Sequence, residues 1–129
     1  MYMFSGKETS DIHKYNIAND NWSQLKVRLP EAISVAIALP IKDNILLFGG
    51  ELEPSNKGHA GAGNFSDLST IFSADMETVL ERKSEGPPAR GWSAGAVWGH
   101  NHVIVVGGLT GDDENPVRIM DVWMGQLNN

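Results

Sequence analysis

The stretch Asn44-Ile45-Leu46-Leu47-Phe48-Gly49-Gly50 decides the fold. It is a short apolar run that ends on a glycine pair, and such a run between turn residues predicts a buried β-strand rather than a helix. The pattern recurs as His102-Val103-Ile104-Val105-Val106-Gly107-Gly108, and a shorter copy, Tyr2-Met3-Phe4-Ser5-Gly6, opens the chain. Copies roughly forty to sixty residues apart indicate an internal repeat, in a range that includes the period of propeller blades.

An aromatic hairpin follows the first glycine copy. Tyr15 and Trp22 flank a polar Asn-Asp turn, as in two strands of a hairpin. After the second copy, Phe72 stands in the tyrosine place and Val79 in the tryptophan place. We therefore expect Tyr15 and Trp22 to pack in the interior of their unit.

A strand of small and apolar residues precedes the second and third glycine pairs, at 33–39 and 92–98. One unit is then four strands: the small-residue strand, the Gly-Gly strand, the aromatic strand and the tryptophan strand. This unit resembles the kelch repeat, a four-stranded β-propeller blade. The resemblance implies an all-β fold of antiparallel blades, with an incomplete blade at 1–29, a full blade at 30–84 and another incomplete blade at 85–129.

The chain is short for such a fold. A propeller typically has about four to eight blades of roughly forty to fifty residues each, and 129 residues hold about two and a half. Repeat units do not bury their faces alone. We therefore expect the C-terminal portion of a longer propeller or a truncated copy of one, with missing blades or self-association covering the open faces.

Composition limits the classes of partner. The net charge is −6 and no basic stripe occurs, which argues against a nucleic-acid partner. No apolar run is long enough to cross a bilayer, so we expect no membrane partner. The absence of cysteine excludes a disulfide scaffold and thiol catalysis and fits a reducing compartment, so the expected location is cytoplasmic.

A candidate metal site lies near the N-terminus, at Glu8, Asp11 and His13. If Asp11 and His13 lie in a strand, its two-residue period puts both side chains on one face, and Glu8 reaches them from the preceding loop. Two carboxylates and an imidazole suit non-haem ferrous iron, Fe(II), with open positions. The alternative is structural: Asp11 caps a turn into the strand and His13 is half exposed.

A long glycine-rich loop follows Gly50, with Glu51 and His59 as its polar content. No amphipathic helix follows to direct its N-terminus at a phosphate, so the phosphate-loop interpretation fails. Either this loop is a functional loop on a rigid scaffold or it is a plain insertion.

The connector before the third unit ends in Arg90-Gly91-Trp92. In an antiparallel blade, the loop before the first strand and the loop after the second lie at the same edge. This edge would collect Arg90 and Trp92 with Glu51 and His59, as a ligand-binding set for a small anion, a sulfate or a carboxylate. The alternative for Arg90 is a structural arginine that bridges two blades. We interpret the acidic loop at 112–114 as a solvated turn, since it lacks the spacing of an EF-hand.

The resemblance narrows to one branch of kelch proteins. The segments 47–51, 58–63, 75–78 and 88–94 are similar to the penultimate-blade region of the specifier proteins, that is, the nitrile-specifier, epithiospecifier and thiocyanate-forming proteins and their fungal and bacterial relatives. The chain departs from the plant pattern at two positions. Ile33 stands where the plant proteins usually have an arginine, and Val79 stands where a tryptophan is expected.

This resemblance implies a specific chemistry. The plant proteins act with ferrous iron on the unstable aglucones that myrosinase releases from glucosinolates, and their iron site is a Glu, Asp and His cluster. Glu8, Asp11 and His13 fall in that place. A Fe(II)-dependent lyase or isomerase is thus one expected function, given a full propeller. A non-catalytic kelch module that binds a protein partner is the second, and a propeller similar to sugar mutarotases is the third.

Overall fold

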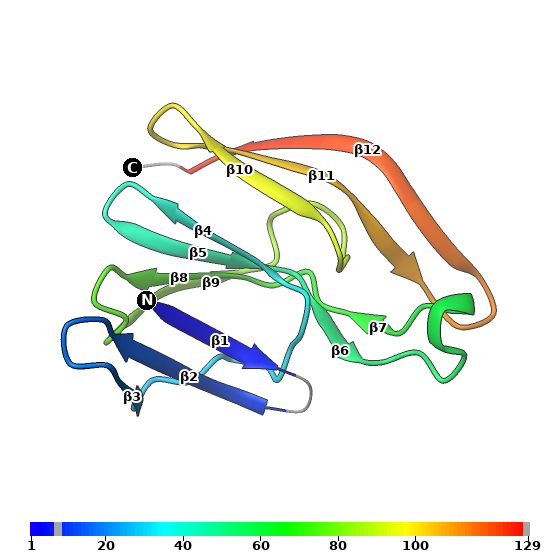
Figure 1. The fold of residues 1–129 in the computed structure, drawn as a ribbon. Coiled ribbons are helices and arrows are strands. Elements are labelled where there is room, and N and C mark those ends of the chain that lie inside the picture. The colour runs from blue at the N-terminus through cyan, green and yellow to red at the C-terminus, as the bar shows by residue number, and fades with distance from the viewer. Residues whose placement is uncertain (7–8, 128–129) are drawn as a thin grey trace.

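The computed structural model describes residues 1–6 and 9–127, and within these ranges the chain is built from antiparallel strands (Figure 1). The N-terminal sheet is formed by β1 (Tyr2–Gly6), β2 (Thr9–Asn16) and β3 (Asn21–Gln24). The middle sheet has the order β4 (Ile37–Ile41), β5 (Asn44–Phe48), β8 (Ser69–Ser73) and β9 (Val79–Lys83). The C-terminal sheet is formed by β10 (Ala94–Trp98), β11 (His102–Gly111) and β12 (Pro116–Gln126). The all-β prediction is confirmed.

The Gly-Gly strand β5 occupies the centre of the molecule. It pairs with β4 on one side and β8 on the other, and alternate side chains face opposite sheets. Leu47 packs in a cluster with Ile12 and Phe72, toward the N-terminal sheet. Phe48 packs with Val105 in a cluster on the opposite side. A strand buried on both faces explains why this stretch is apolar at successive positions rather than at every second one.

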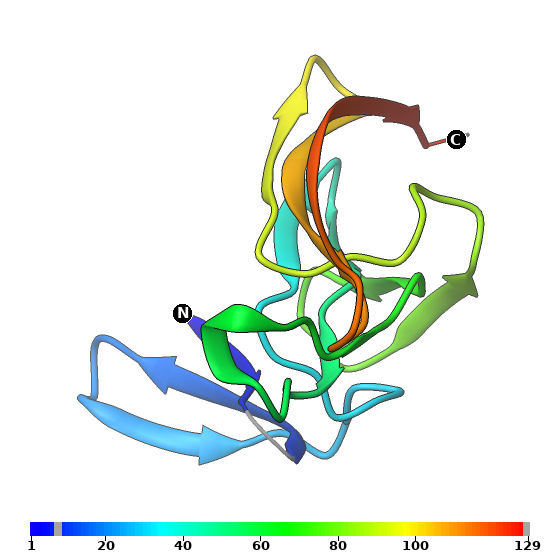
Figure 2. The same cartoon turned by 90° about the vertical axis from the view of Figure 1, so that its right-hand side faces the viewer.

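The middle sheet lies between the other two sheets (Figure 2). A third cluster, Ile41, Leu46 and Val103, joins it to the C-terminal sheet. Its two neighbours each keep an outer face that no sheet of the described residues covers. On the C-terminal sheet this face carries Trp98, Val122 and Met124, all exposed.

The glycine pairs have the same geometry in the middle and C-terminal sheets. Gly49 and Gly50 have φ values of 68° and 107°, and Gly107 and Gly108 have values of 63° and 116°. Only glycine enters this region without strain. At Gly49 the close approach of Arg90 adds a second reason, because a Cβ atom there would lie 2.6 Å from the Arg90 carbonyl oxygen.

The aromatic hairpins are paired as predicted, but their burial differs. Tyr15 lies opposite Trp22, and Phe72 lies opposite Val79. Phe72 is fully buried, whereas Trp22 is 49% exposed and its ring packs on that of Tyr15 at 4.9 Å. The prediction that Trp22 is buried is wrong for this chain. Trp22 lies on the edge strand β3, whose residues are all exposed. Phe72 lies on β8, which has a paired strand on each side.

No helix in the described residues is long and apolar enough to span a membrane.

Candidate ligand-binding groove

A groove of about 480 Å³ lies between two segments that are distant in sequence. One wall is the loop that follows β5, and the other is the start of the C-terminal sheet together with β12. Figure 1 shows the loop, with its short helix η1 (Gly58–Ala60), beside the turn that joins β11 and β12. The groove is lined by Glu51, Pro54, Ser55, Gly58, His59, Gly61, Trp92, Gly108, Leu109 and Arg118.

The loop wall is an ordered insertion. Its base is a hairpin of β6 (Glu51–Glu53) and β7 (Asn64–Phe65). Backbone hydrogen bonds between Glu51 and Ser34, at 2.7 and 3.0 Å, hold the start of this hairpin. Glu51 therefore projects from a fixed backbone rather than from a free loop.

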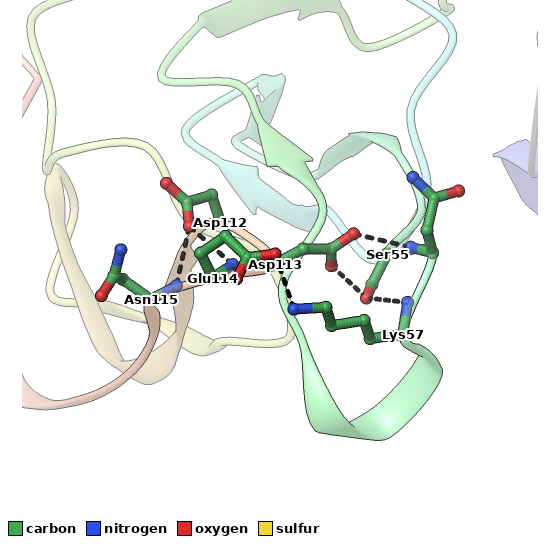
Figure 3. A network of polar contacts seen from close by, with 7 residues as sticks. Ser55, Lys57, Asp112, Asp113, Glu114 and Asn115 are labelled. Carbon is green, nitrogen blue, oxygen red and sulfur yellow. Dashed lines mark hydrogen bonds and ion pairs between the residues drawn. The ribbon is translucent and has the colours of Figure 1, made fainter.

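A polar network docks the tip of the loop on the β11–β12 turn (Figure 3). The Asp113 carboxylate accepts hydrogen bonds from the Ser55 hydroxyl and, at 2.9 Å, from the Asn56 amide. The Lys57 ammonium forms an ion pair with Glu114 at 2.6 Å. The hydrogen bond from Ser55 is the main reason that the pKa of Asp113 lies below its ordinary value. Because Ser55 belongs both to this network and to the groove lining, the network holds the loop wall of the groove.

The acidic turn therefore does more than we predicted. Asp112 behaves as expected of a turn residue, accepting hydrogen bonds from the amides of Glu114 and Asn115 at 2.9 and 2.7 Å. Asp113, in contrast, is turned toward the loop wall and holds it. The interpretation as a purely solvated turn is wrong for Asp113, because its partners are nearly sixty positions away in sequence.

Trp92 supplies the apolar surface of the groove. Its side chain and backbone together are 61% exposed, and its φ is +59°, a conformation rare for a bulky residue. Val35, at the corresponding place before β4, has a φ of +53°, and its carbonyl accepts the Trp92 amide at 3.2 Å. The positive φ therefore occurs at the same place before both β4 and β10, whereas only the second place carries an exposed indole, that of Trp92.

Arg90 is not among the residues that line the groove. It is 2% exposed, and its guanidinium donates to the carbonyls of Pro88 and Gly107 at 3.1 and 3.3 Å. The same group forms an ion pair with Asp121 on β12 at 2.8 Å. These contacts support the structural alternative, because they join the connector before β10 to β11 and β12. The Nε and Nη1 atoms of Arg90 already have protein partners, which favours the structural role, and a ligand contact of Arg90 stays a prediction.

Arg118 is the residue that sequence reasoning missed. It lies on β12 directly opposite Leu109 of β11, and its side chain is exposed at the groove. Among the described residues it takes part in no ion pair. The sequence pattern ends the third glycine strand at Gly108 and indicates a further strand only near the C-terminus, without its register, so Arg118 could not be placed at this edge.

Of the predicted metal ligands, Asp11 and His13 are not among the residues that line the groove. Glu8 lies outside the described residues. Asp11 and His13 are both in β2, and Asp11 Oδ1 lies 3.3 Å from an Arg28 nitrogen. That oxygen is buried and accepts no hydrogen bond in the described part of the chain, but the Arg28 guanidinium beside it already compensates its charge. The described residues contain no cluster of three metal-ligating side chains.

The fold and the groove define an all-β protein of several antiparallel sheets with a loop-lined candidate site. No protein-family model matches the chain. It is 28% identical over 118 residues to the N-(sulfonatooxy)prop-2-enimidothioate sulfolyase of Thlaspi arvense, a match that covers 84% of this chain and 33% of that protein. The chain thus spans about a third of the length of this curated relative. The similarity supports a relationship to specifier-type proteins at most.

Proposed function

We propose that the chain is part of a kelch-type β-propeller and that its groove binds a small anionic ligand that carries a sulfate-like or carboxylate group. The proposal rests mainly on one observation: Glu51, His59 and Trp92 line one groove although they come from different units. The relative's printed name describes a substrate with a sulfonatooxy group, which is an anion. The recurring glycine and left-handed backbone positions support the propeller part of the proposal.

The groove has the features of a small-molecule site. A concave surface with an aromatic wall and few polar groups is typical of such sites. Trp92 offers a flat apolar face, and His59 and Glu51 offer hydrogen-bonding groups on the opposite wall. These groups are held in place by backbone pairing and by the Asp113 network, so little ordering is needed on binding.

Calorimetric titration with phenyl sulfate tests this proposal, with the neutral methyl phenyl ether as the control ligand. We expect the native chain to bind the sulfate and to bind the ether at least about tenfold more weakly. Trp92→Ala weakens binding of the sulfate, whereas Trp98→Ala, on the open face of the C-terminal sheet, leaves it unchanged. Equal binding of the two ligands contradicts the proposal.

Ferrous iron at Glu8, Asp11 and His13 is a separate part of the proposal. Asp11 and His13 lie two positions apart in β2, and because Asp11 Oδ1 faces Arg28 at 3.3 Å, an iron ion there would have to displace that guanidinium. Bound iron would supply Lewis-acid or electron-donor chemistry of the specifier type toward a sulfur-bearing ligand. Anaerobic titration of the native chain and of His13→Ala decides it: we expect weaker binding by the variant, and equal binding would show that the side chains are ordinary strand residues.

A non-catalytic module that binds a protein is the second candidate. The exposed apolar face of the C-terminal sheet favours it, because exposed apolar patches commonly mark interaction sites. The two candidates separate on the titration above, since a protein-binding face predicts no binding of phenyl sulfate and no effect of Trp92→Ala.

A further inference from the structure

We infer that Arg118 holds the anionic group of the ligand and that Glu51 sets the ligand's orientation. This inference rests on the proposed function of the groove. It assigns the cationic role to a residue on β12 that neither the sequence pattern nor the similarity to the sulfolyase indicated.

The first step is the charge balance of the basic residues next to the groove wall in sequence. Lys57 and Arg90 each have a carboxylate within 4 Å, so their charges are already compensated. Arg118 has no carboxylate partner among the described residues, and its side chain lines the groove wall. A free guanidinium offers paired, charge-assisted hydrogen bonds to a sulfate or a carboxylate.

The second step is the position of Arg118. The ladder between β11 and β12 is interrupted between Val106 and Gly108, and beyond this bulge Arg118 lies opposite Leu109. Gly91 pairs with Leu109 through two backbone hydrogen bonds, at 2.8 and 3.0 Å. Gly91, Leu109 and Arg118 therefore form one row of paired residues, and Trp92 directly follows Gly91. An anion at Arg118 can place an attached apolar ring beside Trp92.

The third step is the carboxylate on the other wall. Glu51 also lines the groove and is in no ion pair among the described residues. Its negative charge disfavours an anion close to it and favours a hydroxyl or an ammonium group. The two walls are therefore complementary to a ligand with its anionic end at Arg118 and a hydrogen-bond donor at the Glu51 end.

Substitutions at the two walls test the assignment, because they change the affinity for a simple anion in opposite directions. With phenyl sulfate, which has no donor group, we expect Arg118→Gln to bind about tenfold more weakly than the native chain. Glu51→Gln removes the repulsion and binds a few-fold more tightly, roughly as expected for unlike charges at partly exposed sites. Added salt should reduce both differences in affinity between the variants and the native chain, because it screens the charges.

The matched control is Arg82→Gln, because Arg82 is an exposed arginine on β9 that is in no ion pair in the described part of the chain and does not line the groove. Native affinity in Arg82→Gln with a loss in Arg118→Gln supports the inference. Native affinity in Arg118→Gln, or weaker binding by Glu51→Gln, overturns it. If the native chain itself fails to bind phenyl sulfate, the proposed function fails first, and the two failures are thus distinguished.

Discussion

The buried contacts of Arg90 indicate that this side chain contributes to stability. Its guanidinium satisfies two carbonyl oxygens and pairs with Asp121, almost without contact with water. We expect Arg90→Gln to lower the free energy of unfolding by about 2–4 kcal/mol, since buried acceptors lose a charged donor. Denaturant unfolding measures this, with Arg82→Gln as the control that changes stability by less than about 0.5 kcal/mol. Equal midpoints for the two variants would contradict the structural role.

The residues of the groove were only partly predictable from sequence. Glu51, His59 and Trp92 were found because antiparallel topology places the loops on either side of a strand pair at one edge. The choice between the two roles of Arg90 was not predictable, because its partner Asp121 lies on a strand whose place in the sheet no local pattern shows. Arg118 was missed for the same reason.

Among the elements, the Gly-Gly turns carry a strict steric requirement. Gly49 and Gly99 have nearly the same φ, 68° and 66°, but a Cβ at Gly49 meets the Arg90 carbonyl at 2.6 Å and one at Gly99 meets nothing within 4 Å. We expect Gly99→Ala to cost about 1–2 kcal/mol from backbone conformation alone. Gly49→Ala should cost about 1–3 kcal/mol more from the steric conflict. Thermal and denaturant unfolding of the pair measures the difference, and equal losses would show that the close approach is not a constraint.

The inserted loop depends on its polar attachment to the β11–β12 turn. Because the pKa of Asp113 is lowered in the folded chain, its contribution is present above the ordinary value of 3.8 and is lost as the pH falls below that value. At neutral pH we expect Asp113→Asn to loosen the loop and to speed cleavage after Lys57 by a lysine-specific protease.

The control for this prediction is Asp43→Asn, because Asp43 is an exposed residue in the turn between β4 and β5. It should be cleaved at the native rate. A rate for Asp113→Asn that matches both the native chain and this control would mean that the network does not hold the loop.

The elements themselves were largely predictable, because strand and turn signals are local. The apolar run at 44–48, the glycine pairs and the paired aromatic hairpins all occur as expected. The burial of Trp22 was not, since burial depends on which sheets lie against a strand, and β3 is at an edge. The division into blades at 1–29, 30–84 and 85–129 stays a prediction.

For the whole molecule, the open sheet faces are the main consequence of the architecture. The C-terminal sheet exposes Trp98, Val122 and Met124 on one face, an apolar surface that water disfavours. We expect the isolated chain to self-associate in a concentration-dependent manner, as measured by size-exclusion chromatography with light scattering. Val122→Lys should shift the distribution toward the monomer. A native chain that is monomeric and melts in one sharp, cooperative transition would contradict the incomplete-propeller interpretation.

The central claim is that the groove, and not an open sheet face, binds the anionic ligand. Amide and indole NMR spectra of the native chain during titration with phenyl sulfate test it directly, because the chain has four tryptophans and their indoles report on different places. Trp92 lines the groove, whereas Trp22 and Trp98 lie on outer sheets and are exposed. We expect a saturable shift of the Trp92 indole signal with the signals of Trp22 and Trp98 unchanged. A shift confined to Trp22 or Trp98, or no shift of Trp92 at saturating ligand, would contradict it.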